Sequence, residues 1–376
     1  MAPKSARDRR DRLRDVVVLI RMASPMRTLL LLLIVIGCQK PDCPTPPAVQ
    51  PKPEPAAPAP EKSTYLDYRG RNDLLTGGVR MIPVKTSAGT FNVWTKRIGN
   101  NPRIKVLLLH GGPGAPHEYF DAFDSYFPNA EIEYYLYDQL EGGNSDHPDK
   151  PELWNIPRFV DEVEQVRQAL QLDNFYLFGH SWGGILAIEY ALAHPEHLKG
   201  LVISNMMASG PAYNKYAHDV LMPEMDPKVL AEILKLEAAK KFEDPRYEEL
   251  LVTNYYTQHI LRMPPDKWPD GVSRAFMRLS KKLYTAMQGP SEMGLSGKLE
   301  KWDRVADLPK IAVPTLVIGA KHDTMDPAHM EMMSKQVKHG RYLFCPEGSH
   351  LAMYDDQKTY FTGLIGFIKD VDAGRF

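Results

Sequence analysis

The chain has 376 residues, which is long enough for one large α/β core with an insertion. Hydrophobic residues make up 43% of the chain and charged residues 25%, the balance of a folded globular protein. Because 46 basic and 47 acidic side chains leave a net charge of −1, the chain has no overall positive field that would hold nucleic acid.

Residues 1–37 are predicted to be a signal peptide. Residues 1–15 are rich in basic side chains, and residues 29–36 form an uninterrupted apolar run. A membrane-spanning helix needs roughly 20 such residues, whereas the hydrophobic region of a signal peptide needs only about 7–15. Met26-Arg27 stands directly before the run, so Met26 is an alternative start that would place residues 1–25 outside the protein.

The apolar run ends in Val35-Ile36-Gly37-Cys38, which resembles a bacterial lipobox, in which the cysteine is acylated and becomes the new N-terminus. We therefore expect Cys38 to be lipidated. Acyl chains contribute ~0.8 kcal/mol per buried CH₂, so a multiply acylated cysteine would be a stable anchor. The alternative is an ordinary signal peptide that happens to contain a cysteine.

Residues 38–62 are predicted to be the lipidated cysteine and a proline-rich linker. Nine of the 32 prolines fall between Pro41 and Pro60, and the stretch has almost no bulky apolar residue with which to build a core. Such proline density favours an extended, semi-rigid spacer. The expected location is the bacterial cell envelope, with the folded part tethered to a membrane.

From residue 63 onward the sequence alternates predicted strands with predicted helices. Residues 79–96 alternate in polarity around Gly89 and predict a hairpin. One predicted helix presents an apolar face at spacings of four, three and four residues: Phe159, Val163, Val166 and Leu170. Short apolar runs predict further, buried strands at 104–109, 132–137, 175–178, 200–204, 311–318 and 341–344. The pattern indicates an α/β fold, with a mostly parallel central sheet and helices on both faces.

Residues 206–300 interrupt this alternation. They show helical periodicity without a convincing strand, and they hold eight of the 17 methionines and many aromatic residues. Since the block stands between two predicted strands, we interpret it as a helical cap inserted into a core of residues 63–205 and 301–376. For any single aromatic residue, packing inside the cap is as good an explanation as a role at a site.

Gly179-His180-Ser181-Trp182-Gly183 is a G-x-S-x-G motif between the strand 175–178 and the helical run 182–194. That context is the one a nucleophile elbow requires, since glycines permit a tight turn that exposes the serine at a helix N-terminus. Ser181 is therefore the predicted nucleophile.

A serine nucleophile needs a base, and the base needs an orienting carboxylate. Asp323 follows the predicted strand that begins at 311, and His350 follows the one at 341–344. The order Ser181, Asp323, His350 is that of the α/β-hydrolase fold. Asp326 is the alternative candidate for the carboxylate that orients the base. His180 and His322 are expected to be structural, because neither follows a final strand.

The segment His110-Gly111-Gly112-Pro113-Gly114 follows the first long buried strand. Its peptide N–H groups can face a developing oxyanion, with the N–H of Trp182 as the second donor. We expect Gly112 to be the donor from this loop. The alternative is a tight glycine turn without a catalytic part.

These motifs together resemble the proline iminopeptidases (prolyl aminopeptidases), which are α/β-hydrolase exopeptidases that remove an N-terminal residue, often proline. The resemblance covers about residues 65–376 and includes Asp138-Gln139 with Ser145, and a late Gly348-Ser349-His350. Residues 242–262 and the stretch Gln288-Gly289-Pro290-Ser291-Glu292 look most similar to the tricorn-interacting aminopeptidase branch.

The resemblance implies that Glu292 helps to hold the free amine of the substrate, because that branch has a glutamate in the matching G-P-x-E position. Two residues depart from the family pattern: Glu141 stands where the loop commonly has a glycine, and Thr324 stands where the branch tends to have a second acid. Glu141 is therefore a further candidate carboxylate for the amine.

The predicted function is a serine aminopeptidase that releases proline or another small or apolar N-terminal residue from short peptides through an acyl-enzyme. The alternative is an esterase or amidase of the same fold without a free-amine requirement. The third possibility is a surface lipoprotein without catalytic activity.

The cysteines Cys38, Cys43 and Cys345 match neither a disulfide scaffold nor a zinc cluster. Since no H-E-x-x-H spacing or cofactor motif is present, no metal and no cofactor is expected. The oligomeric state stays open.

Overall fold

A computed structural model describes residues 63–376. The predicted signal peptide, the expected lipidation site Cys38 and the proline-rich linker lie outside the described residues. Within residues 63–376, none of the helices combines the length and the hydropathy that crossing a membrane would require.

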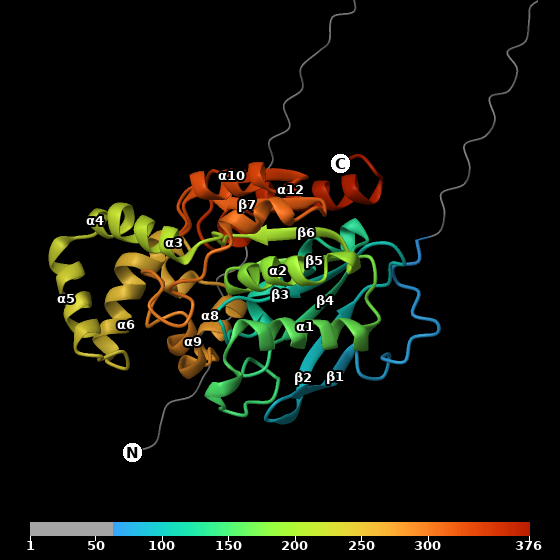
Figure 1. Ribbon diagram of the computed structural model, residues 1–376, viewed down its shortest axis with the longest axis horizontal. Helices are drawn as coiled ribbons and strands as arrows, with labels where there is room; N and C mark the ends of the chain where they lie inside the picture. Colours follow the sequence, from blue (N-terminus) through green and yellow to red (C-terminus); the bar gives the residue numbers. More distant parts are fainter. Residues whose placement is uncertain (1–62) are drawn as a thin grey trace, which may run out of the picture. The chain divides into compact units, whose positions relative to one another are not determined.

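An eight-stranded sheet forms the centre of the described part, in the order β1-β2-β4-β3-β5-β6-β7-β8 (Figure 1). The first three strands in this order are antiparallel neighbours, β1 (Val79–Thr86), β2 (Gly89–Ile98) and β4 (Glu133–Asp138). The remaining pairings are parallel. They join β4 to β3 (Lys105–Leu109), β5 (Phe175–His180), β6 (Leu198–Ser204), β7 (Thr315–Ala320) and β8 (Gly340–Cys345). The α/β-hydrolase fold predicted from the sequence is confirmed.

Two hydrophobic clusters cover the two faces of the sheet, because successive residues of a strand point to opposite sides. In β3, Leu107 and Leu109 belong to one cluster, and Val106 and Leu108 belong to the other. The first cluster packs against α1 (Ile156–Leu170), α2 (Trp182–Ala193) and α10 (Pro327–Gln336). The second packs against η1 (His117–Ser125) and α12 (Gln357–Asp372).

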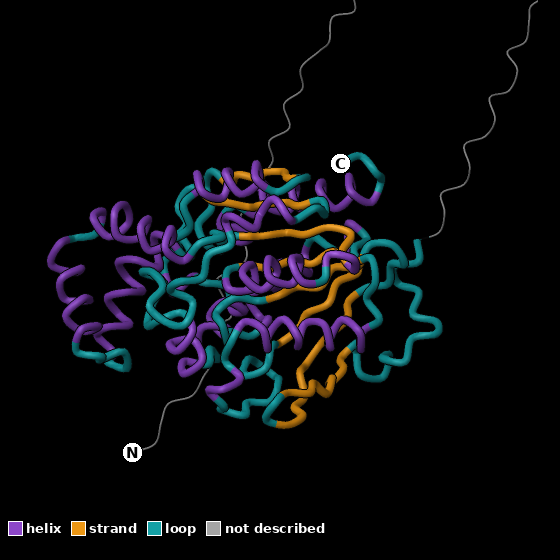
Figure 2. Tube along the Cα trace, in the orientation of Figure 1, coloured by secondary structure: helices purple, strands orange, loops and turns teal. Residues whose placement is uncertain are grey.

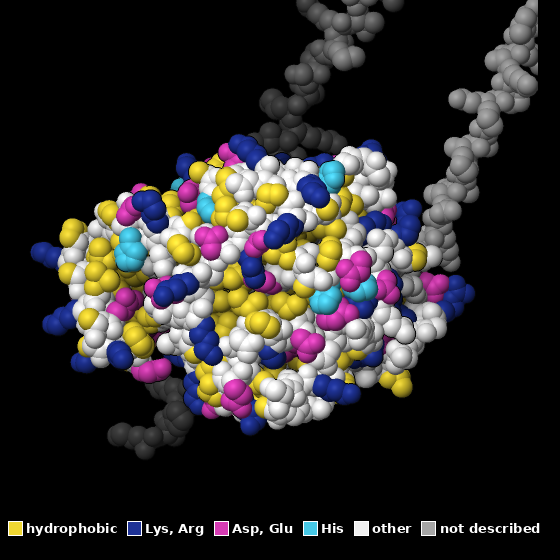
Figure 3. Space-filling model, in the orientation of Figure 1, with side chains coloured by type: hydrophobic (Ala, Val, Ile, Leu, Met, Phe, Trp, Pro, Cys, Tyr) yellow, Lys and Arg dark blue, Asp and Glu magenta, His cyan; other side chains and the backbone are white. Residues whose placement is uncertain are grey.

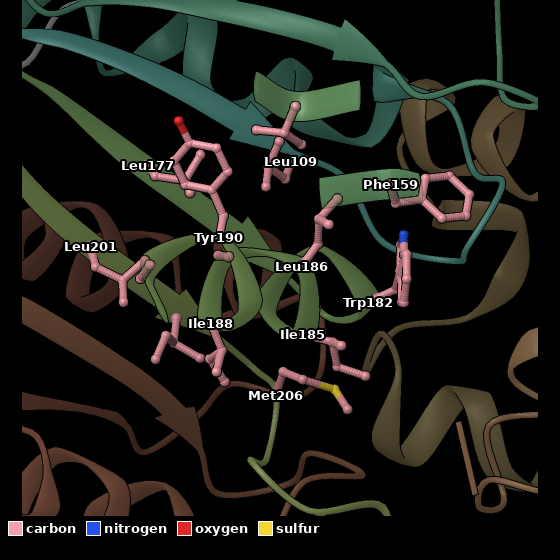
Figure 4. Packing of buried hydrophobic residues seen from close by; sticks show 14 of the residues in the cluster. Leu109, Phe159, Leu177, Trp182, Ile185, Leu186, Ile188, Tyr190, Leu201 and Met206 are labelled. Carbon is pink, nitrogen blue, oxygen red and sulfur yellow. The ribbon is translucent and has the colours of Figure 1, made fainter. Parts of the chain in front are cut away.

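Helix α2 runs through the first cluster and is buried over most of its surface. Figure 4 shows its side chain Leu186 below Leu109, and Ile185 beside Met206, and these residues belong to the same cluster as the strand residues Leu177 and Leu201. This packing fixes the helix whose first residue follows Ser181.

The segment between β6 and β7 contains helices and loops, drawn from yellow-green to orange in Figure 1 and in purple and teal in Figure 2. Its helices of seven or more residues are α3 (Gly210–Tyr216), α5 (Pro227–Ala238), α6 (Pro245–Leu251), α8 (Asp270–Met277) and α9 (Lys281–Met287), and the short α4 (Met222–Glu224) lies between α3 and α5. We call residues 206–300 of this segment the cap. On the face shown in Figure 3, basic and acidic side chains are interspersed over both the cap and the core, so this face has no large patch of one sign.

Strand β7 begins later than the sequence predicts. The apolar run suggests a strand over 311–318, whereas β7 covers Thr315–Ala320. Pro314 has no N–H to donate to the ladder, and the N–H of Ile311 closes a turn on Leu308 O at 3.0 Å. The strand ends at Ala320, three residues before Asp323.

Candidate active site

Ser181 lies in the tight turn between β5 and α2. Its backbone has φ 55° and ψ −128°, a region that L-residues rarely adopt. Its N–H donates to Ser204 O at 3.0 Å, and its carbonyl accepts from the N–H of Gly184 at 2.7 Å. The turn presents the serine at the carboxyl edge of the sheet and at the N-terminus of α2.

The glycines of the motif are required by close backbone contacts. A Cβ placed on Gly179 would lie 2.0 Å from Gly183 O, and one placed on Gly183 would lie 2.1 Å from Leu109 O. Side chains at either position would therefore push α2 away from β3 and β5, and the serine with it.

His350 and Asp323 are hydrogen-bonded in the interior of the site. Nδ1 of His350 is 2.8 Å from Oδ1 of Asp323, and both side chains are buried. Because a carboxylate only accepts, Nδ1 carries the proton, and Nε2 is left with a lone pair for the serine hydroxyl. Burial lowers the pKa of His350, but the Asp323 carboxylate outweighs it and raises the pKa above its usual value.

His180 and Tyr119 support this arrangement from the adjacent side. Nε2 of His180 is 2.8 Å from the carbonyl of His350, and Nδ1 is 3.1 Å from the hydroxyl of Tyr119. Burial holds the pKa of His180 well below its usual value, so the ring is neutral. His180 therefore anchors the backbone of His350, and the structural role predicted for it fits these contacts. His322 is not among the residues that line the cavity at Ser181.

Two peptide N–H groups next to Ser181 are available to an oxyanion. The N–H of Gly111 is occupied, since it donates to the Tyr119 hydroxyl at 2.6 Å. Within residues 63–376, the N–H groups of Gly112 and Trp182 donate to no protein acceptor. Gly112 has φ 110°, and a Cβ there would lie 2.7 Å from the nitrogen of Ala115, so the loop needs glycine at this position.

Gln139 connects the glycine loop to the nucleophile helix. Its side-chain oxygen accepts from Nε1 of Trp182 at 2.8 Å, and its backbone N–H donates to Nε2 of His110 at 2.9 Å. Nδ1 of His110 consequently donates to Gly111 O, 2.9 Å away. Burial lowers the pKa of His110 to about 4, which keeps this ring neutral. The network fixes the distance between the two candidate oxyanion donors.

A cavity of about 190 Å³ opens in front of Ser181 and His350. The core contributes Gly111, Gly112, Tyr119 and His180 to its wall, and the cap contributes mainly apolar and aromatic side chains: Phe242, Tyr247, Leu251, Val252, Tyr256, Ala275, Phe276, Leu279 and Tyr284. The cavity wall also includes an exposed ion pair, in which Nζ of Lys281 on α9 lies 3.6 Å from Oε2 of Glu248 on α6.

Glu292 lines this cavity and lies among tyrosines. Its Oε1 accepts from the Tyr284 hydroxyl at 2.6 Å, and its Oε2 lies 3.4 Å from the Tyr213 hydroxyl. Its side-chain hydrogen bonds are to tyrosine hydroxyls and not to a Lys or Arg among the described residues, and His350 is the cationic group whose charge acts on it. Burial raises the pKa of Glu292, although His350 and the two hydroxyls act in the opposite direction. An unpaired carboxylate at this position can bind a cationic group.

Glu141 does not reach the cavity. Its Oε1 accepts from Nε1 of Trp154 at 3.3 Å and lies 3.4 Å from the backbone nitrogen of Lys150. The residue has φ 75°, the backbone region that favours glycine. The structure therefore does not bring Glu141 together with Ser181 and Glu292, and the substrate role suggested for it is not supported by its position.

Several residues of the site were not identified from the sequence, among them Asn205, Tyr119 and the tyrosines around Glu292, and Gln139 was named there only as part of a motif, without a role. Asn205 directly follows β6, and a polar residue at the end of a buried strand is the signal that could have identified it.

Within residues 63–376, no group of three or more His, Cys, Asp or Glu side chains could hold a metal ion.

Comparisons with known proteins identify the fold and the family of the chain. The family model described as alpha/beta hydrolase fold matches residues 105–357. The chain is 57% identical over 294 residues to a proline iminopeptidase of Flavobacterium johnsoniae, covering 78% of this chain and 98% of that protein. It is 56% identical over 300 residues to a proline iminopeptidase of Elizabethkingia meningoseptica, covering 79% of this chain and 100% of the relative.

Two solved structures are similar to this chain over most of its length. VinJ matches with a TM-score of 0.72 and 30% identity over 78% of this chain and 99% of its own. The proline iminopeptidase of Mycobacterium smegmatis matches with a TM-score of 0.68 and 27% identity, over 79% of this chain and 100% of its own.

Proposed function

The chain belongs to the proline iminopeptidase family of the α/β-hydrolases, and on this premise we propose that it is a serine aminopeptidase that releases N-terminal proline from short peptides. The observation that carries the proposal is Glu292, an unpaired carboxylate in the same cavity as Ser181 and His350.

In the proposed reaction His350 Nε2 takes the proton of Ser181 Oγ as the oxygen attacks the carbonyl carbon of the first residue. The Gly112 and Trp182 N–H groups donate to the oxyanion of the tetrahedral intermediate. His350, now an imidazolium held by Asp323, gives the proton to the leaving amine, and the acyl-enzyme forms. Water, deprotonated by His350, then releases the amino acid.

Glu292 explains in this proposal why the enzyme needs a free N-terminus. The protonated amine of the substrate pairs with the carboxylate, which otherwise bonds only to tyrosine hydroxyls among the described residues. The mainly apolar cap wall then surrounds a small apolar side chain such as the proline ring. A blocked N-terminus carries no charge and is bulkier, so it loses this contact.

The test compares the naphthylamides of proline, alanine and leucine with their N-acetylated forms and with a short acyl ester. We expect rapid hydrolysis of the free proline compound and no measurable hydrolysis of its acetylated form. Equal rates for the free and acetylated compounds would instead support the esterase or amidase alternative.

Two finer assignments are also proposed. The stretch Gln288-Gly289-Pro290-Ser291-Glu292 supports a place in the tricorn-interacting branch of the family, where action on short free peptides is expected. The lipobox-like sequence before Cys38 supports a lipid anchor and a location in the bacterial cell envelope. Metabolic labelling with a palmitate analogue tests the anchor: the label should disappear in Cys38→Ser, and labelling that is unchanged in this variant contradicts it.

A further inference from the structure

The first described loop, residues 63–78, exposes three leucines. Leu66 is 72% exposed, Leu74 52% and Leu75 103%. We call residues 63–78 the leucine loop. Exposed apolar side chains are normal when they occur singly, but a group of them commonly marks an interaction surface.

The leucine loop has a defined conformation, so the exposure of its leucines does not result from a lack of contacts. The Arg71 guanidinium pairs with Asp73 at 2.6 Å and donates to Gly99 O at 3.1 Å. Tyr65 is buried against Gly99, where a Cβ would lie 2.3 Å from the ring. The polar and aromatic side chains of the loop thus hold it to the core, and the leucines remain on the outside.

The charges of the leucine loop cancel. It contains two arginines and two aspartates, and they pair as Arg69 with Asp67 at 2.5 Å and Arg71 with Asp73 at 2.6 Å. An acidic or basic partner would find no net charge to complement. An uncharged apolar surface fits a partner that buries leucine side chains without an electrostatic contribution.

The leucine loop lies at the edge of the sheet opposite to the active site. It bonds to Gly99 and Asn100, which precede the parallel strand β3, whereas Ser181, Asp323 and His350 follow the carboxyl ends of their strands. Figure 1 shows this separation, with the blue N-terminal loop at one end of the described part and the cap at the other. A partner on the leucine loop would leave the cavity open.

We propose that the leucine loop is a membrane-contact surface that inserts its leucines into the lipid bilayer to which Cys38 is anchored. The inference rests on the lipid anchor of the proposed function. Residues 39–62 connect Cys38 to Ser63, so the chain from the anchor enters the described part three residues before Leu66. Contact through this loop orients the cavity away from the membrane, toward peptides in solution.

The test uses residues 39–376, which lack Cys38 and therefore any acyl chain. This form contains the whole described unit, and the relatives consist of that unit, since they match over 98% and 100% of their own length. It is sedimented with vesicles of phosphatidylethanolamine and a minority of phosphatidylglycerol. We expect binding that does not weaken at high salt, because the loop has no net charge.

The double variant Leu74→Ser/Leu75→Ser should lower the partition coefficient roughly 100-fold, about tenfold for each leucine no longer buried. The control is Leu234→Ser, which changes a 41% exposed leucine on α5 of the cap and should bind as the unsubstituted form does. Hydrolysis of proline naphthylamide should be the same in all three proteins.

Absence of vesicle binding, equal binding by the double variant, or release by salt would each overturn the proposal. If the double variant instead abolishes a dimer seen by sedimentation equilibrium, the occupant is a second copy of the chain and the membrane assignment is wrong. Palmitate labelling of Cys38 is measured separately, so the experiments can contradict the proposed lipid anchor and the proposed contact surface independently of each other.

Discussion

The side-chain amide of Asn205 donates to Oδ2 of Asp323 over 2.7 Å, while Oδ1 of the same carboxylate bonds to His350. Asn205 also approaches the carbonyl of Ser349 at 3.3 Å, and its own Oδ1 accepts from the Ser204 hydroxyl at 2.7 Å. The asparagine therefore ties the ends of three strands together. It leaves Oδ1 of Asp323 directed at the imidazole.

Asp323→Asn should lower kcat by about 10⁴-fold, because the amide can donate to Nδ1 and so stabilise the wrong tautomer of His350. The matched control is Asp326→Asn. Asp326 accepts from the N–H of Ala328 at 2.9 Å at the start of α10 and is the competing acid of the sequence analysis. We expect the control to retain most activity. If Asp326→Asn is the inactive variant, the assignment of the triad acid is wrong.

Ser181→Ala should reduce turnover on the order of 10⁴-fold or more and leave the fold intact, since it removes one oxygen atom. Circular dichroism checks the fold, and a fluorophosphonate probe checks the nucleophile. Labelling of the variant to the same extent as the wild type would place the nucleophile elsewhere.

Glu292→Gln should lower kcat/KM for free-amine substrates by roughly 10- to 200-fold. A charge-assisted hydrogen bond contributes about 1.5–3 kcal/mol, and each 1.4 kcal/mol is a factor of ten. Hydrolysis of a short acyl ester, which has no amine, should change little at a pH where His350 is neutral. Glu248→Gln is the matched control, because Glu248 lines the same cavity but already pairs with Lys281.

Two results would contradict this role of Glu292. An equal loss on the ester and on the free-amine substrate would indicate that the side chain supports the cap or the triad. No loss on either substrate would show that the amine is bound by another group.

The pH dependence should differ between the two substrate classes. His350 acts as a base only when neutral, and Asp323 raises its pKa, so ester hydrolysis should rise with pH through that raised value and then level off. Free-amine substrates should in addition lose rate at high pH, as the substrate amine deprotonates at about 7.7–8.0.

Glu292→Gln should shift the acidic limb of ester hydrolysis to lower pH. The negative charge of Glu292 contributes to raising the pKa of His350, so its removal makes the imidazole easier to deprotonate. Profiles of kcat/KM against pH measure the shift. An unmoved limb would mean that Glu292 and His350 are not electrostatically coupled.

The sequence alone determined the nucleophile turn and the order of the triad. These features are local: the glycines at 179 and 183 are needed because neighbouring backbone lies within 2.1 Å of their missing Cβ atoms, and each catalytic residue follows its own strand. Buried strands have a simple apolar pattern, so the α/β fold is readable from the same signals. The late start of β7 was not predicted, because the apolar pattern does not show that a proline keeps the residues before it out of the sheet.

Only the tertiary structure decided which carboxylate faces the cavity. Glu141 and Glu292 are both acidic residues near glycine-rich turns, but Glu141 bonds to Trp154, while Glu292 meets Tyr213, which is 79 residues away in the chain. Likewise, Asn205 reaches Asp323 across 118 residues. Contacts between residues so far apart in the chain depend on how folding brings the cap and the strand ends together. A local pattern of residue types does not predict them.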